Sequence, residues 1–291
     1  MKSLLPILAI AAACSTQRDV TVVDASSSAT LSRRSSAWRW GVTVDDVANV
    51  DAVVDALSAL PARATARIVF DEGQPASYYV PATTAIHRVS DVMGELLDSQ
   101  FMKDISVADY GARTREYLAT VGANVDLWEV GNEINGEWLG ADAMAKVSAA
   151  YEVVKAAHRP TALTLYYNQD CWEKPEHEMF RWTETNVPAS VRQGIDVVLV
   201  SYYEDDCNGL RPSWPDVFAR LGRLFPTASL GFGECGTENP SGKDSLLRRY
   251  YAIRLAEPRF IGGFFWWYFA EDMVPRTKPL WRTLASAMVT P

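Results

Sequence analysis

From residue 38 onward, the chain alternates between two hydrophobic patterns. Short apolar runs, typical of strands buried on both faces, are followed by longer stretches with apolar residues at helical spacing. We predict eight strands, at Trp38–Val44, Ala66–Phe70, Val92–Leu97, Leu127–Val130, Thr164–Tyr167, Asp196–Tyr202, Ser229–Gly233 and Gly263–Tyr268. Helices are predicted between and after them, at Val50–Leu60, Ser106–Val121, Ala141–Ala157, Glu176–Asn186, Trp214–Leu224, Lys243–Leu255 and Leu280–Met288, while residues 74–90 are expected to form a loop and a short helix.

This alternation predicts an α/β fold, a single (β/α)8 barrel over residues 38–291. Barrels of this kind typically need about 250 residues. A doubly wound open sheet is the competing fold, and it would normally carry a glycine-rich turn after its first strand. The corresponding sequence here, VTVDDVANV, has no glycine. We see no internal repeat and no boundary to a second domain.

The N-terminus resembles an export signal. Lys2 supplies a positive start, and Leu4–Ala13 is an apolar run too short to cross a bilayer. Residues 1–14 are therefore expected to be a signal peptide or a lipoprotein signal, with Cys14 as the lipidated residue in the second case. Ala11 stands where lipidation signals usually have Leu, so both forms of export stay open. Residues 15–37 are rich in Ser and are expected to form a tether or lead-in.

Composition excludes some partners. The formal net charge of −8 argues against nucleic acid, which requires a basic face. The three histidines are far apart and show no metal-ligand spacing, so we expect no metal site. Ten Trp and twelve Tyr are many for this length, and aromatic rings stack well on the apolar faces of sugars. We expect a monomer that contacts membranes only through a lipid at Cys14.

Two glutamates follow predicted strands in a way that suggests chemistry. Glu133 follows strand four in LWEVGNEINGEW, and Glu234 follows strand seven in LGFGEC. In a barrel, the carboxyl ends of the strands surround one active-site mouth, so these two side chains should share a pocket. Glycoside cleavage needs such a pair: a protonated carboxyl to donate to the leaving oxygen and an ionised one to attack or to activate water.

With these residues in place, the chain resembles the clan A glycoside hydrolases over residues 38–288. That resemblance implies that Glu133 is the general acid/base, that Glu234 is the nucleophile and that Asn132 holds the sugar 2-hydroxyl. It also implies a Tyr after strand six against the nucleophile, for which we take Tyr202. The histidines found near strands three and six in several families of the clan are missing here, so we assign no family within it.

Further site residues follow from the same resemblance or from their position at the mouth. On strand eight, Trp267 fits the floor of the sugar subsite best, with Trp266 beside it. Arg67 matches an Arg that some members keep on strand two. Weaker candidates for substrate contact lie after strands four, five and eight: Trp138, Asn168, Trp172 and Glu271. Asp98, after strand three, either faces the substrate or caps the next helix.

Cys171 and Cys207 follow neighbouring strands, five and six, on the same face of the barrel. Export would make oxidation available, so we predict a disulfide between them. Cys235 is expected to be a small buried residue rather than a nucleophile, because no His is placed to activate it.

The sequence therefore predicts an exported retaining glycoside hydrolase that cleaves β-linked glycosidic bonds in a polysaccharide or oligosaccharide by double displacement and needs no cofactor. The alternative is a barrel that binds carbohydrate without catalysis.

Overall fold

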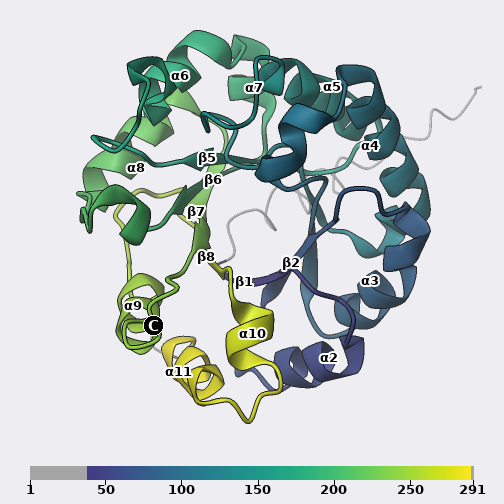
Figure 1. Ribbon diagram of the computed structural model, residues 1–291, viewed down its shortest axis with the longest axis vertical. Coiled ribbons are helices and arrows are strands. Elements are labelled where there is room, and N and C mark those ends of the chain that lie inside the picture. The colour runs from purple at the N-terminus through teal and green to yellow at the C-terminus, as the bar shows by residue number, and fades with distance from the viewer. Residues whose placement is uncertain (1–37, 290–291) are drawn as a thin grey trace, which may run out of the picture. The chain divides into compact units, whose positions relative to one another are not determined.

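A computed structural model describes residues 38–289. The predicted signal, the lipidation site at Cys14 and the tether lie outside the described residues. Eight parallel strands close into a barrel in sequence order, and helices surround it (Figure 1). The strands are β1 (Arg39–Val44), β2 (Thr65–Val69), β3 (Asp91–Glu95), β4 (Leu127–Glu129), β5 (Thr161–Tyr166), β6 (Val197–Tyr202), β7 (Ser229–Cys235) and β8 (Gly262–Trp266). The predicted (β/α)8 barrel is confirmed.

The helices are α2 (Val50–Ser58), α3 (Val80–His87), α4 (Val107–Val121), α5 (Ala143–Ala156), α6 (Met179–Asn186), α7 (Ala189–Gly194), α8 (Trp214–Leu224), α9 (Lys243–Tyr251), α10 (Phe269–Met273) and α11 (Pro279–Ala287). The stretch expected to be mostly loop, residues 74–90, contains a 3₁₀ turn followed by α3. The sequence pattern missed α7 and α10 because each is too short to show a helical period. Strand β5 begins three residues earlier than predicted.

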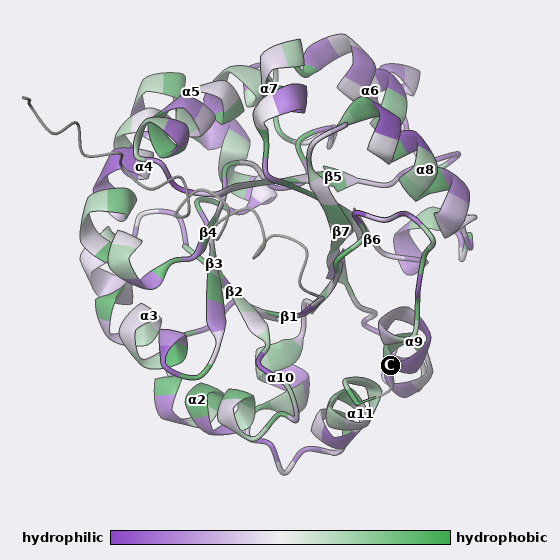
Figure 2. Cartoon of the chain, turned by 180° about the vertical axis from the view of Figure 1, so that it is seen from behind, coloured by the Kyte–Doolittle hydropathy of each residue, from purple (hydrophilic) through white to green (hydrophobic). Residues whose placement is uncertain are grey.

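Local sequence explains several helix starts. The side chains of Asn49, Ser106 and Glu178 accept hydrogen bonds from the first turns of α2, α4 and α6. Figure 2 shows hydrophobic residues concentrated in the central strands, with polar residues more frequent on the surrounding helices. No helix within residues 38–289 has the length and apolar character needed to span a membrane.

The strands bury both faces, each against a different part of the core. Outward-facing side chains pack with the helices in one large cluster. A smaller cluster comprises Met93, Leu127, Ala162, Val197, Leu199, Ile261 and Phe265. In β6 the members of this smaller cluster alternate with Val198 and Val200 of the larger one, as expected when successive side chains point to opposite faces. The smaller cluster therefore fills the barrel interior.

The β7 strand carries a bulge that decides where Glu234 points. Val200 pairs with Phe232 and Tyr202 pairs with Cys235, so β7 holds one residue more than β6 over this interval. Phe232 and Cys235 both belong to the outer cluster, which leaves Gly233 and Glu234 opposite Ser201. The backbone N–H of Glu234 donates to the Ser201 hydroxyl at 3.0 Å. Strict alternation would turn Glu234 outward with Phe232; the extra residue turns it toward the mouth.

The β7–β8 contact leaves no room for a side chain at Gly263. Gly263 has φ +94°, and a Cβ there would lie 2.0 Å from the carbonyl oxygen of Phe232. Gly73 has a similar φ of +70° but open space around it. A Gly263→Ala substitution should therefore prevent folding or destabilise the barrel far more than Gly73→Ala, which incurs only the left-handed backbone cost of about 1–2 kcal/mol. Urea unfolding of both variants measures the difference, and equal losses would contradict this steric account.

Candidate active site

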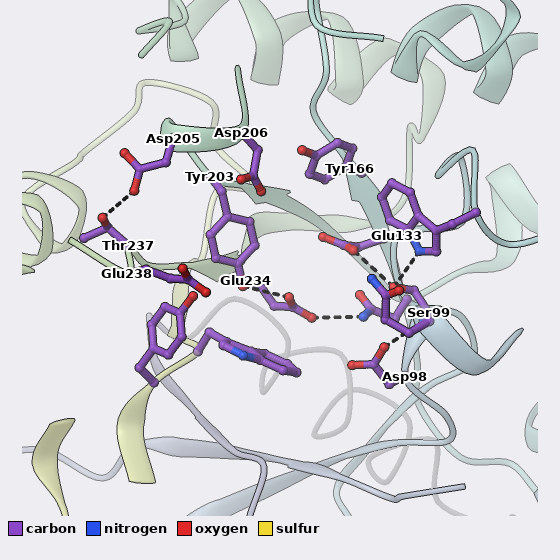
Figure 3. A pocket seen from close by; sticks show the side chains of 15 residues that line it. Asp98, Ser99, Glu133, Tyr166, Tyr203, Asp205, Asp206, Glu234, Thr237 and Glu238 are labelled. Carbon is purple, nitrogen blue, oxygen red and sulfur yellow. Dashed lines mark hydrogen bonds between the residues drawn. The ribbon is translucent and has the colours of Figure 1, made fainter. Parts of the chain in front are cut away.

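A cavity of about 470 Å³ opens at the carboxyl ends of the strands. Its lining comes from the ends of β3 to β8 and comprises Asp98, Ser99, Gln100, Asn132, Glu133, Trp138, Tyr166, Tyr203, Asp205, Asp206, Glu234, Thr237, Glu238, Trp267 and Tyr268. Both predicted glutamates therefore face one cavity, as Figure 3 shows. Within the described residues, no group of three or more His, Cys, Asp or Glu side chains is arranged to hold a metal ion.

Glu234 is surrounded by hydrogen-bond donors. Its Oε1 accepts from Asn132 Nδ2 at 2.9 Å and lies 2.8 Å from Arg67 Nη2. Its Oε2 accepts from the Tyr203 hydroxyl at 2.9 Å (Figure 3). The side chain is nearly buried, and its two oxygens face three donors, one of them a guanidinium. Burial and the neighbouring Glu234 carboxylate raise the pKa of Tyr203 well above its ordinary value, so Tyr203 remains a phenol that can donate.

Glu133 has a different environment. It lies in the turn after β4 with φ +47°, and it is only 7% exposed. Its Oε2 accepts from the Ser99 hydroxyl at 3.2 Å, and Trp138 Nε1 in turn donates to Ser99 at 3.0 Å. Glu133 Oε1 has no hydrogen-bond partner. Burial above all, and then the nearby carboxylates of Glu234 and Asp98, raise the pKa of Glu133 well above the ordinary 4.5. A protonated Glu133 beside a charge-stabilised Glu234 is the division of roles that an acid–nucleophile pair requires.

The prediction that Tyr202 touches the nucleophile is wrong. Its hydroxyl donates to the Leu210 carbonyl at 2.6 Å, and its ring packs on Tyr167 and Trp214 outside the barrel. Tyr203, one residue on, makes the contact instead. The cause is the alternation along β6, in which Val198, Val200 and Tyr202 face outward. Counting this parity in the sequence would have favoured Tyr203.

The same alternation separates Trp266, the last residue of β8, from Trp267, which follows it. Trp267 lines the cavity, with the Arg67 guanidinium carbon 5.9 Å from its ring centroid. Trp266 does not line the cavity, contrary to its inclusion among the substrate-binding candidates. It is fully buried in the outer cluster, and its Nε1 donates to Asp272 at 3.0 Å. Arg67 is 1% exposed and contacts Glu234 rather than lining the cavity, so its inclusion among the substrate contacts is also wrong.

Of the weaker candidates, Trp138 lines the cavity and three others do not. Asn168 is buried, and its amide is occupied by the backbone of His177 and Met179. Trp172 lines a separate hollow beside α6, and Glu271 is an exposed residue of α10. Position after a strand was the only basis for these three, and the loops carry them away from the mouth.

Sequence reasoning missed further lining residues: Ser99, Gln100, Tyr166, Thr237, Glu238 and Tyr268. Tyr166 shares the inward parity of Ala162 in β5, so counting from the strand would have found it. Asp98 lines the cavity, and its carboxylate also caps the following 3₁₀ turn by accepting from the Gln100 backbone N–H at 2.7 Å. The predicted disulfide is confirmed: Cys171 and Cys207 are bonded, with Cα atoms 5.1 Å apart. Cys235 is a buried free thiol whose pKa burial raises, in keeping with its expected passive role.

No protein-family model matches the sequence, and no curated protein matches it either. Among solved structures, the fold is similar to Gas2p of Saccharomyces cerevisiae in complex with laminaritriose and laminaritetraose. The TM-score is 0.56 with 13% identity, over 87% of this chain and 64% of that one. A complex of the same yeast protein with an unnamed compound gives 0.57 and 13%, over 87% and 65%. At this identity the likeness establishes the fold, and the chain spans less than two thirds of those neighbours.

The environment of Glu133 generates a prediction that does not depend on activity. Replacing Asp98 with Asn removes a nearby negative charge and should lower the pKa of Glu133. Replacing Ser99 with Ala removes a hydrogen bond that favours the charged form and should raise it. Carboxyl ¹³C NMR titration, with the resonance assigned through Glu133→Gln, measures both shifts. Two shifts of the same sign would contradict this electrostatic account of the cavity.

Proposed function

We propose that this protein is a retaining glycoside hydrolase acting on β-linked carbohydrate. The observation that carries the proposal is the pair of glutamates in one cavity with opposite environments. Glu133 is buried and has a raised pKa, whereas Glu234 accepts contacts from Arg67, Asn132 and Tyr203. Glycoside cleavage requires one carboxyl of each kind on either side of the scissile bond.

In the proposed reaction, Glu234 attacks the anomeric carbon while Glu133 donates its proton to the departing oxygen. The glycosyl ester on Glu234 is then hydrolysed by a water molecule that Glu133, now ionised, deprotonates. Closing the cycle returns the proton to Glu133 and the negative charge to Glu234. The Tyr203 hydroxyl and the Asn132 amide hold the attacking carboxylate throughout.

Asn132 is suited to contact the sugar itself. Its Nδ2 is used by Glu234, but its buried Oδ1 has no hydrogen-bond partner in the protein. An unpartnered buried acceptor is costly, and a sugar hydroxyl would satisfy it. The resemblance to clan A assigns this contact to the 2-hydroxyl, where it strengthens in the transition state. Trp267 would form the subsite floor, and Trp138 would offer a second ring at the mouth.

Two observations guide the choice of sugars to test. The yeast neighbour is described with laminari-oligosaccharides, which makes these a first choice among β-linked substrates to test. Asp205, Asp206 and Glu238 line the outer cavity, and their charge would disfavour acidic sugars. A protein of this kind would meet such substrates outside the cytoplasm, and the Cys171–Cys207 disulfide supports export, either free or through a lipid at Cys14.

A carbohydrate-binding barrel without catalysis is the second candidate, since barrels host many functions. A protein that only binds sugars does not need a protonated carboxyl beside an ionised one, so the glutamate pair favours catalysis. Sugar binding by the wild-type protein with no hydrolysis of any β-linked substrate would favour this second function.

Removing either carboxyl should abolish turnover while leaving the fold intact. Glu133→Gln and Glu234→Gln should each lower kcat by about 10³-fold or more on laminari-oligosaccharides or aryl β-glycosides. Glu238→Gln makes the same chemical change at the rim of the same cavity and should stay within about tenfold of wild type. Reducing-sugar release measures all three, with thermal unfolding as the check on folding. Wild-type rates in the Glu133 and Glu234 variants would refute the assignment.

The two neighbouring tyrosines offer a matched test of the site. Tyr203→Phe removes a hydrogen bond to the Glu234 carboxylate and should lower kcat about 10- to 100-fold, as expected for a bond to a charged group. Tyr202→Phe removes a bond to the Leu210 carbonyl and should affect stability but leave kcat within about twofold. Steady-state kinetics of both variants on one substrate decide the matter, and equal effects on kcat would argue against Tyr203 as the partner of the nucleophile.

A further inference from the structure

Beneath the cavity, one buried cation faces three carboxylates. Arg67 is 1% exposed and lies 2.6 Å from Glu129, 2.8 Å from Glu234 and 3.0 Å from Glu95, measured between the closest charged atoms. Glu95 and Glu129 are fully buried, and neither lines the cavity. The reaction proposed above uses only Glu234 of these three, so the other two need a separate explanation.

The contacts of Glu129 and Glu95 with Arg67 are unequal. Glu129 accepts from Arg67 at two points, from Nε at 2.6 Å and from Nη2 at 3.2 Å, and the Thr164 hydroxyl also donates to it. A two-point contact of this kind fixes the plane of a guanidinium as well as its position. Glu95 contacts Arg67 at one point only, with Oε2 3.0 Å from Nη2, and neither of its oxygens has a hydrogen-bond partner.

The geometry around Arg67 shows why its orientation matters. Nη2 is shared by Glu129, Glu95 and Glu234, whereas the buried Nη1 has no partner. Turning the guanidinium would take Nη2 away from the Glu234 carboxylate. Glu129 contacts both Nε and Nη2 and so fixes the plane of the guanidinium, whereas Glu95 and Glu234 contact Nη2 alone.

We propose that Glu129 is a positioning residue: it holds Arg67 in the orientation that keeps Nη2 on the Glu234 carboxylate, and thereby holds the nucleophile in place for attack. This inference rests on the glycosidase function proposed above. It also assigns a role to the first glutamate of the WEVGNE segment, whose second glutamate is Glu133.

Glu95 is the matched control, since it is the same residue type at the same depth. Burial above all, together with the neighbouring carboxylates of Glu129, Asp98 and Glu234, raises the pKa of Glu95 well above its ordinary value despite Arg67. A protonated Glu95 closely resembles Gln in shape and charge. Glu95→Gln should therefore leave the Arg67–Glu234 contact and the kinetics almost unchanged.

The test compares Glu129→Gln with Glu95→Gln by crystallography and by kinetics. We expect Glu129→Gln to separate Arg67 Nη2 from Glu234 Oε1 and to lower kcat about 10- to 100-fold, as for a misplaced catalytic group, while KM changes by less than about threefold. Glu95→Gln should keep the contact and stay within about threefold of wild type in both constants. An intact Arg67–Glu234 contact in the Glu129 variant, or equal kinetic losses in the two variants, would overturn the proposal.

Two milder substitutions, both at Thr164, test the same proposal if the Glu129→Gln variant does not fold. Thr164→Val removes the hydroxyl that donates to Glu129, and Thr164→Ser keeps it. The Val variant should lower kcat about 3- to 10-fold with KM unchanged, and the Ser variant should restore it. Identical kcat values for the two would count against positioning through Glu129. If the wild-type protein hydrolyses nothing, the glycosidase proposal fails, and the two crystal structures still decide whether Glu129 orients Arg67.

Discussion

The charged layer of the barrel interior depends on one buried cation, Arg67. Arg67 is the one charge that Glu95, Glu129 and Glu234 face together in the barrel interior, where unpaired carboxylates would be very costly. One positive charge cannot neutralise three negative ones, so three ionised carboxylates would leave excess negative charge in the interior. Burial and the neighbouring carboxylates raise the pKa of Glu95, which has the poorest contacts of the three. The barrel interior is thus apolar in one layer and tightly charge-balanced in the layer above it.

The electrostatics of the cavity follow from that layer. Glu234 stands between it and the open space, where its charge is held by three donors and helps to keep Glu133 protonated. The two carboxyls therefore do not titrate independently. The negative charge of Glu234 favours the protonated form of Glu133, so the acid and the nucleophile act as a coupled pair.

Much of this architecture could be predicted from the sequence, because it depends on hydrophobic period. The alternation of buried strands and amphipathic helices indicated the barrel, and the barrel placed Glu133 and Glu234 at one mouth. The disulfide followed from the adjacency of two loops. The errors at Tyr202 and Trp266 arose at a finer scale: the correct strand was identified, but not the face on which each residue lies. For Tyr202, counting alternate positions would have sufficed.

Other features could not have been read from the sequence. Asn168, Trp172 and Glu271 follow strands as Glu133 does, but the path of each loop carries them elsewhere, and loop paths have no period to detect. Arg67 and Glu129 are far apart in the chain, and they pair because β2 and β4 lie on either side of β3 in the folded sheet. The extra residue in β7 is equally hidden, since Gly-Phe-Gly-Glu looks like an ordinary alternating strand end.

That extra residue makes the position of the nucleophile depend on chain length rather than on chemistry alone. Substitutions in β7 leave the count of residues unchanged and so leave Glu234 facing the mouth. Loss of Gly233 would restore regular pairing with β6 and set the glutamate directly opposite Ser201, which would shift its carboxyl relative to Arg67, Asn132 and Tyr203. Among natural variants of this barrel, length differences should therefore be tolerated in the surface loops but absent from this short segment, whatever residues occupy it.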